Sequence, residues 1–240
     1  KYREEINFLK KIQKIGFDTT IDLTGGDRAA VISYFSGAKK RLGIKSDGFL
    51  GKKYLYTEIF EIDGQKHTVL QNLEVIERMG IKHGKPEIIL NVSEEEKEWA
   101  RQLIFHPSNH KLVHIHPTSR WLFKCWKDEY MAEVIKWFVI NSFRVVLTAS
   151  AEAKELKKIE SILSHTSYSH FGSTKEYSPI INLAGKLTLR QLIAVSSVCD
   201  IYFGVDTAPM HIATALGKPT VALFGPSGAF HWGPWDNEAD

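Results

Sequence analysis

The stretch from Asp200 to Ser227 constrains the fold of this chain more than any other part of it. It begins with an apolar run, Ile201–Val205, which is too short for a helix and is typical of a buried strand. A helical pattern over Met210–Leu216 follows, and a second apolar run, Thr220–Phe224, comes directly after it. A strand, a helix and a strand within so few residues predict a βαβ unit. Its two strands must then be parallel, and its crossover right-handed.

The start of that helix is the first candidate for a functional site. Asp206 and Thr207 precede it and offer side-chain oxygens, so a purely structural role as N-caps is one alternative, worth roughly 1 kcal/mol. In doubly wound sheets, however, ligands bind at the carboxyl ends of strands, where this helix begins. Its unpaired N–H groups and the positive end of its dipole favour a phosphate. His211, one turn into the helix, could brace the turn or contact a substrate.

Strand and helix patterns alternate through the second half of the chain. This alternation predicts an α/β fold, with a parallel sheet covered by helices on both faces. No G-x-G-x-x-G motif follows any expected strand, so the dinucleotide fingerprint is absent from the sequence. The expected strands are Leu112–His116, Arg144–Thr148 and Ile180–Leu183, and the expected helices are Asp128–Phe138, Ala153–Leu163 and Leu189–Cys199.

The first part of the chain carries a shorter α/β pattern. It begins inside a lysine-rich amphipathic helix, and we therefore expect an incomplete N-terminal domain over residues 1–92 and a C-terminal domain over residues 93–240. The polar segment Asn91–Asn109 marks the boundary, and the helix Glu94–Ile104 within it could belong to either side. The expected elements of the first part are strands at Thr19–Leu23 and Arg41–Ile44 and helices at Ala29–Phe35 and His67–Met79.

The loop after the expected strand Leu112–His116 is the second candidate site. It contains two hydroxyl side chains, Thr118 and Ser119, and two cations, Arg120 and Lys124. Hydrogen-bond donors and compensating positive charge are what a diphosphate needs. If the sheet is parallel, this loop lies on the same edge as Asp206. The alternative is an exposed loop whose cations are simply solvated.

Three sequence patterns resemble glycosyltransferase family 9, the bacterial heptosyltransferases that build the inner core of lipopolysaccharide. The family pattern D-[TS]-[GA]-x-x-H is present here as Asp206, Thr207, Ala208 and His211. The loop of the second candidate site ends in the K-x-W of the family, here Lys124-Cys125-Trp126. The pattern A-x-x-x-P-T-x-x-[LY]-[FY]-G-P follows the first motif, through Ala215, Pro219, Thr220, Phe224, Gly225 and Pro226.

The resemblance implies a GT-B architecture, in which two Rossmann-like domains face one another across a cleft and the C-terminal one binds the donor. It implies transfer of heptose from ADP-L-glycero-D-manno-heptose to a heptose of the lipopolysaccharide inner core, with inversion at the anomeric carbon. Lys124 would contact the nucleotide phosphates and stabilise the leaving group. Two alternatives stay open: another GT-B nucleotide-sugar transferase, or a non-catalytic nucleotide-binding module.

The resemblance also implies roles for two further residues. Glu152 occupies the loop where the family places an acid that binds the nucleoside, although as a first-turn helix acid it also has a structural explanation. Leu187 lies where relatives place an apolar wall for adenine, and a core position is its alternative. The catalytic Asp of the family lies in a Gly-Asp loop expected upstream of this chain, and neither Asp22 nor Asp27 matches that motif.

Composition limits the possible partners. A net charge of +3, with both signs interspersed, does not indicate nucleic acid. His114 and His116 alternate along a strand without a third ligand, and the two cysteines form no metal pattern, so we expect no metal and no cofactor. No apolar run approaches the roughly 20 residues of a membrane span. We expect a cytoplasmic protein. The lipid-linked acceptor that the resemblance implies would bring it into peripheral contact with the cytoplasmic face of the inner membrane.

Overall fold

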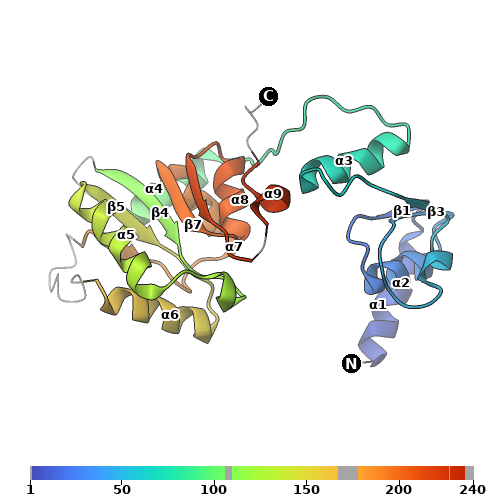
Figure 1. Cartoon of the computed structure of the whole chain (residues 1–240), viewed down its shortest axis with the longest axis horizontal. Coiled ribbons are helices and arrows are strands. Elements are labelled where there is room, and N and C mark those ends of the chain that lie inside the picture. Colours follow the sequence, from blue (N-terminus) through green and yellow to red (C-terminus); the bar gives the residue numbers. More distant parts are fainter. Residues whose placement is uncertain (1, 106–109, 167–177, 227, 236–240) are drawn as a thin grey trace. The chain divides into compact units, whose positions relative to one another are not determined.

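The computed structural model describes residues 2–105, 110–166, 178–226 and 228–235 (Figure 1). The chain divides into two compact units, Lys1–Pro86 and Glu87–Asp240, called unit 1 and unit 2 below. The division falls a little before the boundary expected at residue 92. The helix over Glu94–Leu103 therefore belongs to unit 2.

Unit 1 contains a small sheet of three parallel strands in the order β1-β2-β3. The strands and helices expected from the sequence are present, with ends shifted by one or two residues. The edge strand β3 was not expected, because three residues are too few to establish a periodic pattern. The elements are α1 (Tyr2–Ile15), β1 (Thr19–Asp22), α2 (Asp27–Phe35), β2 (Lys40–Ile44), the 3₁₀ helix η1 (Lys52–Leu55), β3 (Glu58–Phe60) and α3 (Thr68–Arg78).

Unit 2 contains a five-stranded parallel sheet in the order β6-β5-β4-β7-β8. The order reverses between β4 and β7, as in doubly wound folds, and the α/β class expected from the sequence is confirmed. The elements are α4 (Glu94–Leu103), β4 (Lys111–His116), η2 (Leu122–Lys124), α5 (Asp128–Ile140), β5 (Phe143–Leu147), α6 (Ala153–Ser164), β6 (Ile180–Asn182), α7 (Leu189–Val198), β7 (Ile201–Val205), α8 (Ala208–Ala215), β8 (Thr220–Leu223) and α9 (Ala229–Trp232).

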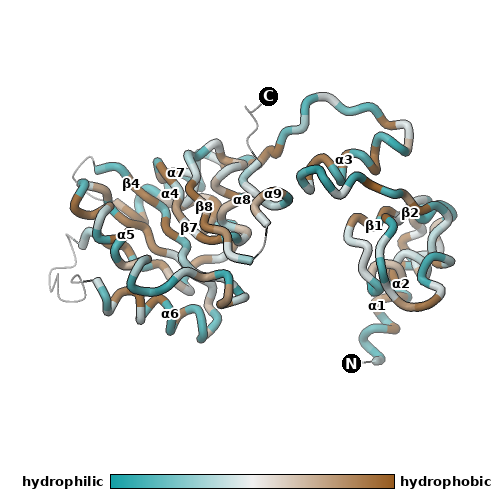
Figure 2. Tube along the Cα trace, viewed as in Figure 1, coloured by the Kyte–Doolittle hydropathy of each residue, from teal (hydrophilic) through white to brown (hydrophobic). Residues whose placement is uncertain are grey.

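Helices cover both faces of the sheet of unit 2. Val113 and Ile115 of β4 pack in one core cluster with residues of α5 and α6, and Leu112 packs in the other with residues of α4 and α7. Because side chains alternate along a strand, His114 and His116 belong to the α7 face. Figure 2 shows the strands at the centre of unit 2 mostly in brown, as expected for strands buried on both faces.

The sheet topology brings the two candidate motifs together. β4 and β7 are parallel neighbours, with His116 opposite Gly204, so the loops after them leave the same edge at the point where strand order reverses. A Cβ on Gly204 would lie 2.7 Å from the backbone oxygen of His116, which explains why glycine occupies this position. No described helix combines the length and the apolar character needed to cross a membrane.

Candidate functional site

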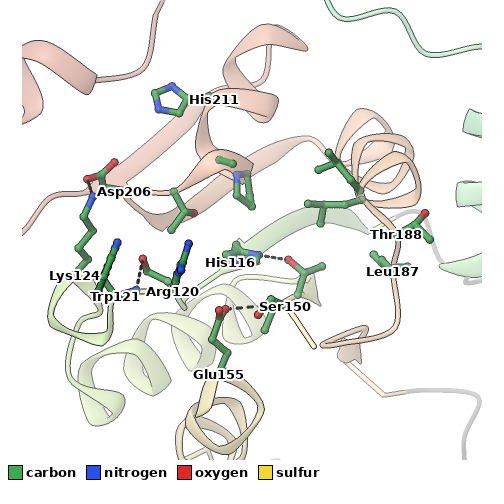
Figure 3. Close-up of a pocket in the computed structure, with 18 of the residues that line it drawn as sticks. His116, Arg120, Trp121, Lys124, Ser150, Glu155, Leu187, Thr188, Asp206 and His211 are labelled. Carbon is green, nitrogen blue, oxygen red and sulfur yellow. Dashed lines mark hydrogen bonds and ion pairs between the residues drawn. The ribbon is translucent and has the colours of Figure 1, made fainter. Parts of the chain in front are cut away.

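A pocket of about 740 Å³ lies at this edge of the sheet, entirely within unit 2. Figure 3 shows its lining side chains converging from the loops after β4, β5 and β7 and from the starts of α7 and α8. All the residues assigned to the donor site from sequence line it, except Thr118 and Glu152. Those that line it are Ser119, Arg120, Lys124, Leu187, Asp206, Thr207, Ala208 and His211.

An ion pair joins the two motifs at the pocket wall. Lys124 Nζ donates a hydrogen bond to Asp206 Oδ2 at 2.6 Å, and the side chains are 21% and 7% exposed. Lys124 is thus not a solvated surface cation. Its ammonium has three donors, and the carboxylate of Asp206 holds it beside the helix start. The pair places a positioned positive charge at the edge where a phosphate is expected.

The start of α8 has no capping bond from the side chain of its N-cap residue. Thr207 is the N-cap residue, but its hydroxyl donates to the Val205 carbonyl oxygen at 3.3 Å and makes no capping bond. The alternative in which Thr207 caps the helix through its side chain is therefore wrong, and Asp206 precedes the N-cap and pairs with Lys124. The backbone N–H groups at this helix start are those of Thr207 and Ala208, which line the pocket. Pro209 has no N–H, and the Met210 N–H donates to the Thr207 carbonyl oxygen at 3.1 Å.

Thr118 supports the pocket from behind. It is fully buried, and its hydroxyl donates to Glu155 Oε2 at 2.7 Å. Glu155 is 3% exposed, and its carboxylate also accepts from the backbone N–H of Ser150 at 3.4 Å. Burial raises the pKa of Glu155, but hydrogen bonds from Ser150 and Thr118 outweigh it and hold that pKa below the usual value. One buried carboxylate thus connects the loops after β4 and β5.

Glu155 is a pocket residue that the sequence reasoning missed. Glu152, which was assigned instead, is exposed at the N-cap of α6 and does not line the pocket. The helical period contained the signal: Glu155 shares one stripe with Ile159 and Ile162, the buried face of α6, whereas Glu152 precedes the helix. A carboxylate on the apolar face of a helix is buried and needs a hydrogen-bond donor, which here is the Thr118 hydroxyl.

An apolar surface and an arginine beside a tryptophan ring complete the lining. Leu187 lines the pocket together with Leu189 and Leu192 at the start of α7, as a wall for a flat ring would require. A second, cationic part of the lining comes from the loop after β4. There the guanidinium of Arg120 lies 5.6 Å from the ring centre of Trp121, a cation–π distance. Trp121 is 56% exposed, so its ring is available to a ligand.

The floor of the pocket contains polar side chains from the strands. His116 is 6% exposed, and its Nδ1 lies 2.8 Å from Thr148 Oγ1. Within the described part of the chain, no group of three or more His, Cys, Asp or Glu side chains has the geometry of a metal site. The Lys and Arg side chains that line this pocket are Lys124 and Arg120.

The comparison with known proteins identifies the family. The family model described as glycosyltransferase family 9 (heptosyltransferase) matches residues 6–240. The chain belongs to glycosyltransferase family 9. The lipopolysaccharide heptosyltransferase 3 of Escherichia coli (strain K12) is 29% identical over 240 residues, which cover 98% of this chain and 66% of that relative. The chain thus spans just under two thirds of the length of this family member.

Solved family members share the fold. The structure of E. coli ADP-heptose LPS heptosyltransferase II covers 98% of this chain with a TM-score of 0.77 and 23% identity, over 70% of its own length. The E. coli heptosyltransferase WaaC, solved with ADP, covers 98% of this chain with a TM-score of 0.70 and 17% identity, over 69% of its own length. At these identities the likeness establishes the fold, which is the GT-B fold expected for the family.

Proposed function

We propose that this chain is the donor-binding part of an inverting heptosyltransferase. Its donor is ADP-L-glycero-D-manno-heptose, and its acceptor is a heptose of the lipopolysaccharide inner core. The observation that carries the proposal is the pocket in which Lys124, Arg120 and the start of α8 converge at the switch point of the sheet. Its volume of about 740 Å³ lies within the usual range for a small-molecule site.

The relatives support the choice of donor and acceptor. A relative aligned along nearly the whole chain is named lipopolysaccharide heptosyltransferase 3, and we infer the same branch-adding type for this chain. WaaC, which has the same fold, was solved with ADP. The apolar wall of Leu187, Leu189 and Leu192 suits a purine ring, and the cations suit the diphosphate.

The chemistry assigned to the pocket is stabilisation of the leaving group. In a single displacement, the acceptor oxygen attacks the anomeric carbon while the bond to the ADP oxygen breaks, so negative charge grows on the diphosphate. Lys124 and the backbone N–H groups of Thr207 and Ala208 would stabilise that charge from fixed positions, which lowers the barrier. Asp206 acts through Lys124, because a carboxylate in direct contact with a diphosphate would be repulsive. We assign no catalytic base to a residue of this chain.

Calorimetric titration of the chain with ADP, UDP and GDP tests the donor assignment. We expect ADP to bind most tightly, because the apolar wall accommodates adenine and the cations accommodate any diphosphate. Equal or tighter binding of UDP would reject the adenine assignment and favour a different nucleotide-sugar transferase. Binding of ADP without heptose transfer by the full-length protein would favour a nucleotide-binding module.

The lipid-linked acceptor implies contact with the cytoplasmic face of the inner membrane. Sedimentation of the full-length protein with vesicles of phosphatidylglycerol and phosphatidylethanolamine tests this part separately. We expect binding that weakens as salt rises, because a peripheral contact made by basic side chains is screened. Equal recovery in the supernatant with and without vesicles would reject membrane contact while leaving the donor assignment intact.

A further inference from the structure

A buried line of four polar side chains runs from helix α7 to the floor of the pocket. Ser196 Oγ lies 3.2 Å from His114 Nδ1, and His114 Nε2 lies 2.8 Å from Thr148 Oγ1. The same Thr148 oxygen lies 2.8 Å from Nδ1 of His116. We call Ser196, His114, Thr148 and His116 the relay. Its first three members are at most 1% exposed, and only His116 and Thr148 line the pocket.

Both imidazoles of the relay are neutral. Burial lowers the pKa of His114 to about 3, with a smaller contribution from His116, and lowers the pKa of His116 to about 4 against a smaller opposing effect of Glu155. A neutral imidazole has one nitrogen that donates and one that accepts. Each histidine therefore donates a hydrogen bond from one ring nitrogen and accepts one at the other. Where two members of the relay are hydrogen-bonded, one must donate and the other must accept.

The buried hydroxyl groups determine that direction. Within the described residues, the Ser196 hydroxyl has His114 as its one hydrogen-bond partner, and the Thr148 hydroxyl has the two histidines. Leaving a buried O–H without an acceptor costs about 1–3 kcal/mol. If His114 Nδ1 carried a proton, the Ser196 proton would have no acceptor. Ser196 therefore donates to His114 Nδ1.

The remaining bonds follow in order. His114 carries its proton on Nε2 and donates it to the Thr148 oxygen, and Thr148 then donates its own proton to His116 Nδ1. Nδ1 of His116 is thus an acceptor, and the proton of this ring is on Nε2. Within the described residues, the structure gives His116 no other hydrogen-bond partner, and Figure 3 shows its ring among the side chains that line the pocket.

We propose that the relay locks His116 in its Nε2–H tautomer, and that this N–H binds an acceptor oxygen of the nucleoside diphosphate sugar. His116 is then a binding residue, and Ser196, His114 and Thr148 are positioning residues. The identity of the ligand rests on the proposed function, whereas the tautomer does not. A neutral donor at the pocket floor adds directional recognition to the charge supplied by Lys124 and Arg120.

The tautomer can be read directly from the chain without ligand. Nitrogen–proton correlation spectra of ¹⁵N-labelled protein at pH 7 distinguish Nδ1–H from Nε2–H rings, and His116→Phe assigns the His116 signals by their loss. We expect the Nε2–H pattern for His114 and His116. An Nδ1–H pattern for His116, or an evenly mixed one, overturns the relay.

Ser196→Ala tests whether the relay acts on the ligand from a distance. It removes the first donor, so either nitrogen of His114 can carry the proton. Thr148 can then donate to His114, and the Nδ1–H tautomer of His116 becomes populated. The Kd should rise as the reciprocal of the Nε2–H fraction, about twofold for an even mixture. Ser197→Ala is the matched control, because its hydroxyl donates to the Ala194 carbonyl oxygen at 2.7 Å and lies outside the relay. An unchanged spectrum for Ser196→Ala, or an equal change for Ser197→Ala, contradicts the inference.

Titration of His116→Phe with ADP and with ADP-heptose tests the contact itself. We expect a loss of roughly tenfold, and Ser196→Ala should have no further effect in this background. Equal losses for both ligands locate the oxygen on ADP, and a loss for ADP-heptose alone locates it on the sugar. No loss for either ligand overturns the contact. If the wild-type chain binds neither ligand, the proposed function and the contact fail together, while the spectrum still decides the relay.

Discussion

The pair of Lys124 and Asp206 shows how single residues unite distant motifs. The two residues are 82 positions apart in sequence, yet their side chains meet at 2.6 Å. The pair has a cost as well as a benefit, because the same carboxylate that orders the ammonium also competes with a phosphate for it. Its net effect on affinity must therefore be measured through both partners.

Replacing Lys124 with Ala should weaken ADP binding by about 1.5–3 kcal/mol, or roughly ten- to a hundredfold, as expected for loss of a charge-assisted hydrogen bond. Calorimetry measures this change. Lys127→Ala is the control, because Lys127 is an exposed cation of the same loop that does not line the pocket. Equal losses for the two variants would reduce the role of Lys124 to general electrostatics.

Asp206→Asn should alter donor affinity or turnover while sparing the melting temperature, since Asp206 is not the N-cap residue of α8 and Asn keeps the hydrogen-bonding capacity of the side chain. The effect should disappear when Lys124 is already Ala, because the two side chains act as a unit. A thermal scan and an ADP titration on the two single variants and the double variant test this coupling. Additive effects would show that Asp206 acts independently of Lys124.

At the scale of elements, the site is an assembly of loops held by buried polar contacts. The loops after β4 and β5 are connected through Glu155, at the first turn of α6, which accepts from Thr118 and Ser150. The helix thus supplies rigidity to loops that line the pocket. An isolated loop with the same residues would have to order itself on binding, at a cost in conformational entropy.

Glu155→Ala should lower the free energy of unfolding by about 1–3 kcal/mol, because it leaves the buried Thr118 hydroxyl without its acceptor. It should also weaken ADP binding, since two loops lose their common anchor. Glu152→Ala, three residues earlier and exposed, should change stability by less than about 0.5 kcal/mol. A larger loss of ADP affinity for Glu152→Ala than for Glu155→Ala would restore Glu152 as the acid of the donor site.

At the scale of the whole molecule, unit 2 contains both the candidate site and the buried histidines that affect stability. All pocket residues belong to it, and so do all tryptophans of the chain. The sheet of unit 2 buries two histidines in its α7 face, where other proteins of this class place apolar residues. These histidines are neutral when buried, and they must lose a proton for the chain to fold in acid. Folding of unit 2 should therefore become less favourable at low pH.

Unit 2 alone, residues 87–240, should bind ADP with a Kd within about threefold of that of the whole chain, because the residues that line the pocket belong to unit 2. Calorimetry on the two proteins compares the affinities, after tryptophan fluorescence has shown that unit 2 is folded. Loss of binding by a folded unit 2 would contradict this division of roles.

Stability of unit 2 should fall as the pH drops from about 6.5 toward 4.5. The folded-state pKa values of His114 (about 3) and His116 (about 4) lie below the ordinary value of 6.5 because the rings are buried. Between these pH values the unfolded chain therefore binds protons that the folded chain does not. Each histidine contributes a slope of up to about 1.4 kcal/mol per pH unit.

Urea unfolding followed by tryptophan fluorescence measures this slope for unit 2. His114→Gln should make the pH dependence shallower, since one buried titrating group is removed. Carboxylates with lowered pKa, such as Glu155, lose their stabilising effect only as the pH falls further, below the ordinary value of 4.5. A slope that is unchanged in His114→Gln would show that other groups control acid stability.

The sequence by itself determined the five strands and helices α4 to α8 of unit 2, together with the two motifs of the candidate site. Apolar runs and helical periodicity are local properties, and the βαβ unit at Ile201–Leu223 leaves one topology, with its helix start at a strand end. Thr207 and Ala208 therefore lie at the pocket, and Lys124 reaches it from the loop after β4, while their roles in binding stay predictions.

Only the tertiary structure decided which side chains form hydrogen bonds with one another. The binding of Lys124 to Asp206, the orientation of Thr118 toward Glu155 and the line from Ser196 to His116 all join residues more than 30 positions apart. Sequence patterns state which face of an element is buried, but hydrogen bonds depend on distances of a few tenths of an ångström. Strand register and helix phase set those distances, and packing of the whole sheet fixes both.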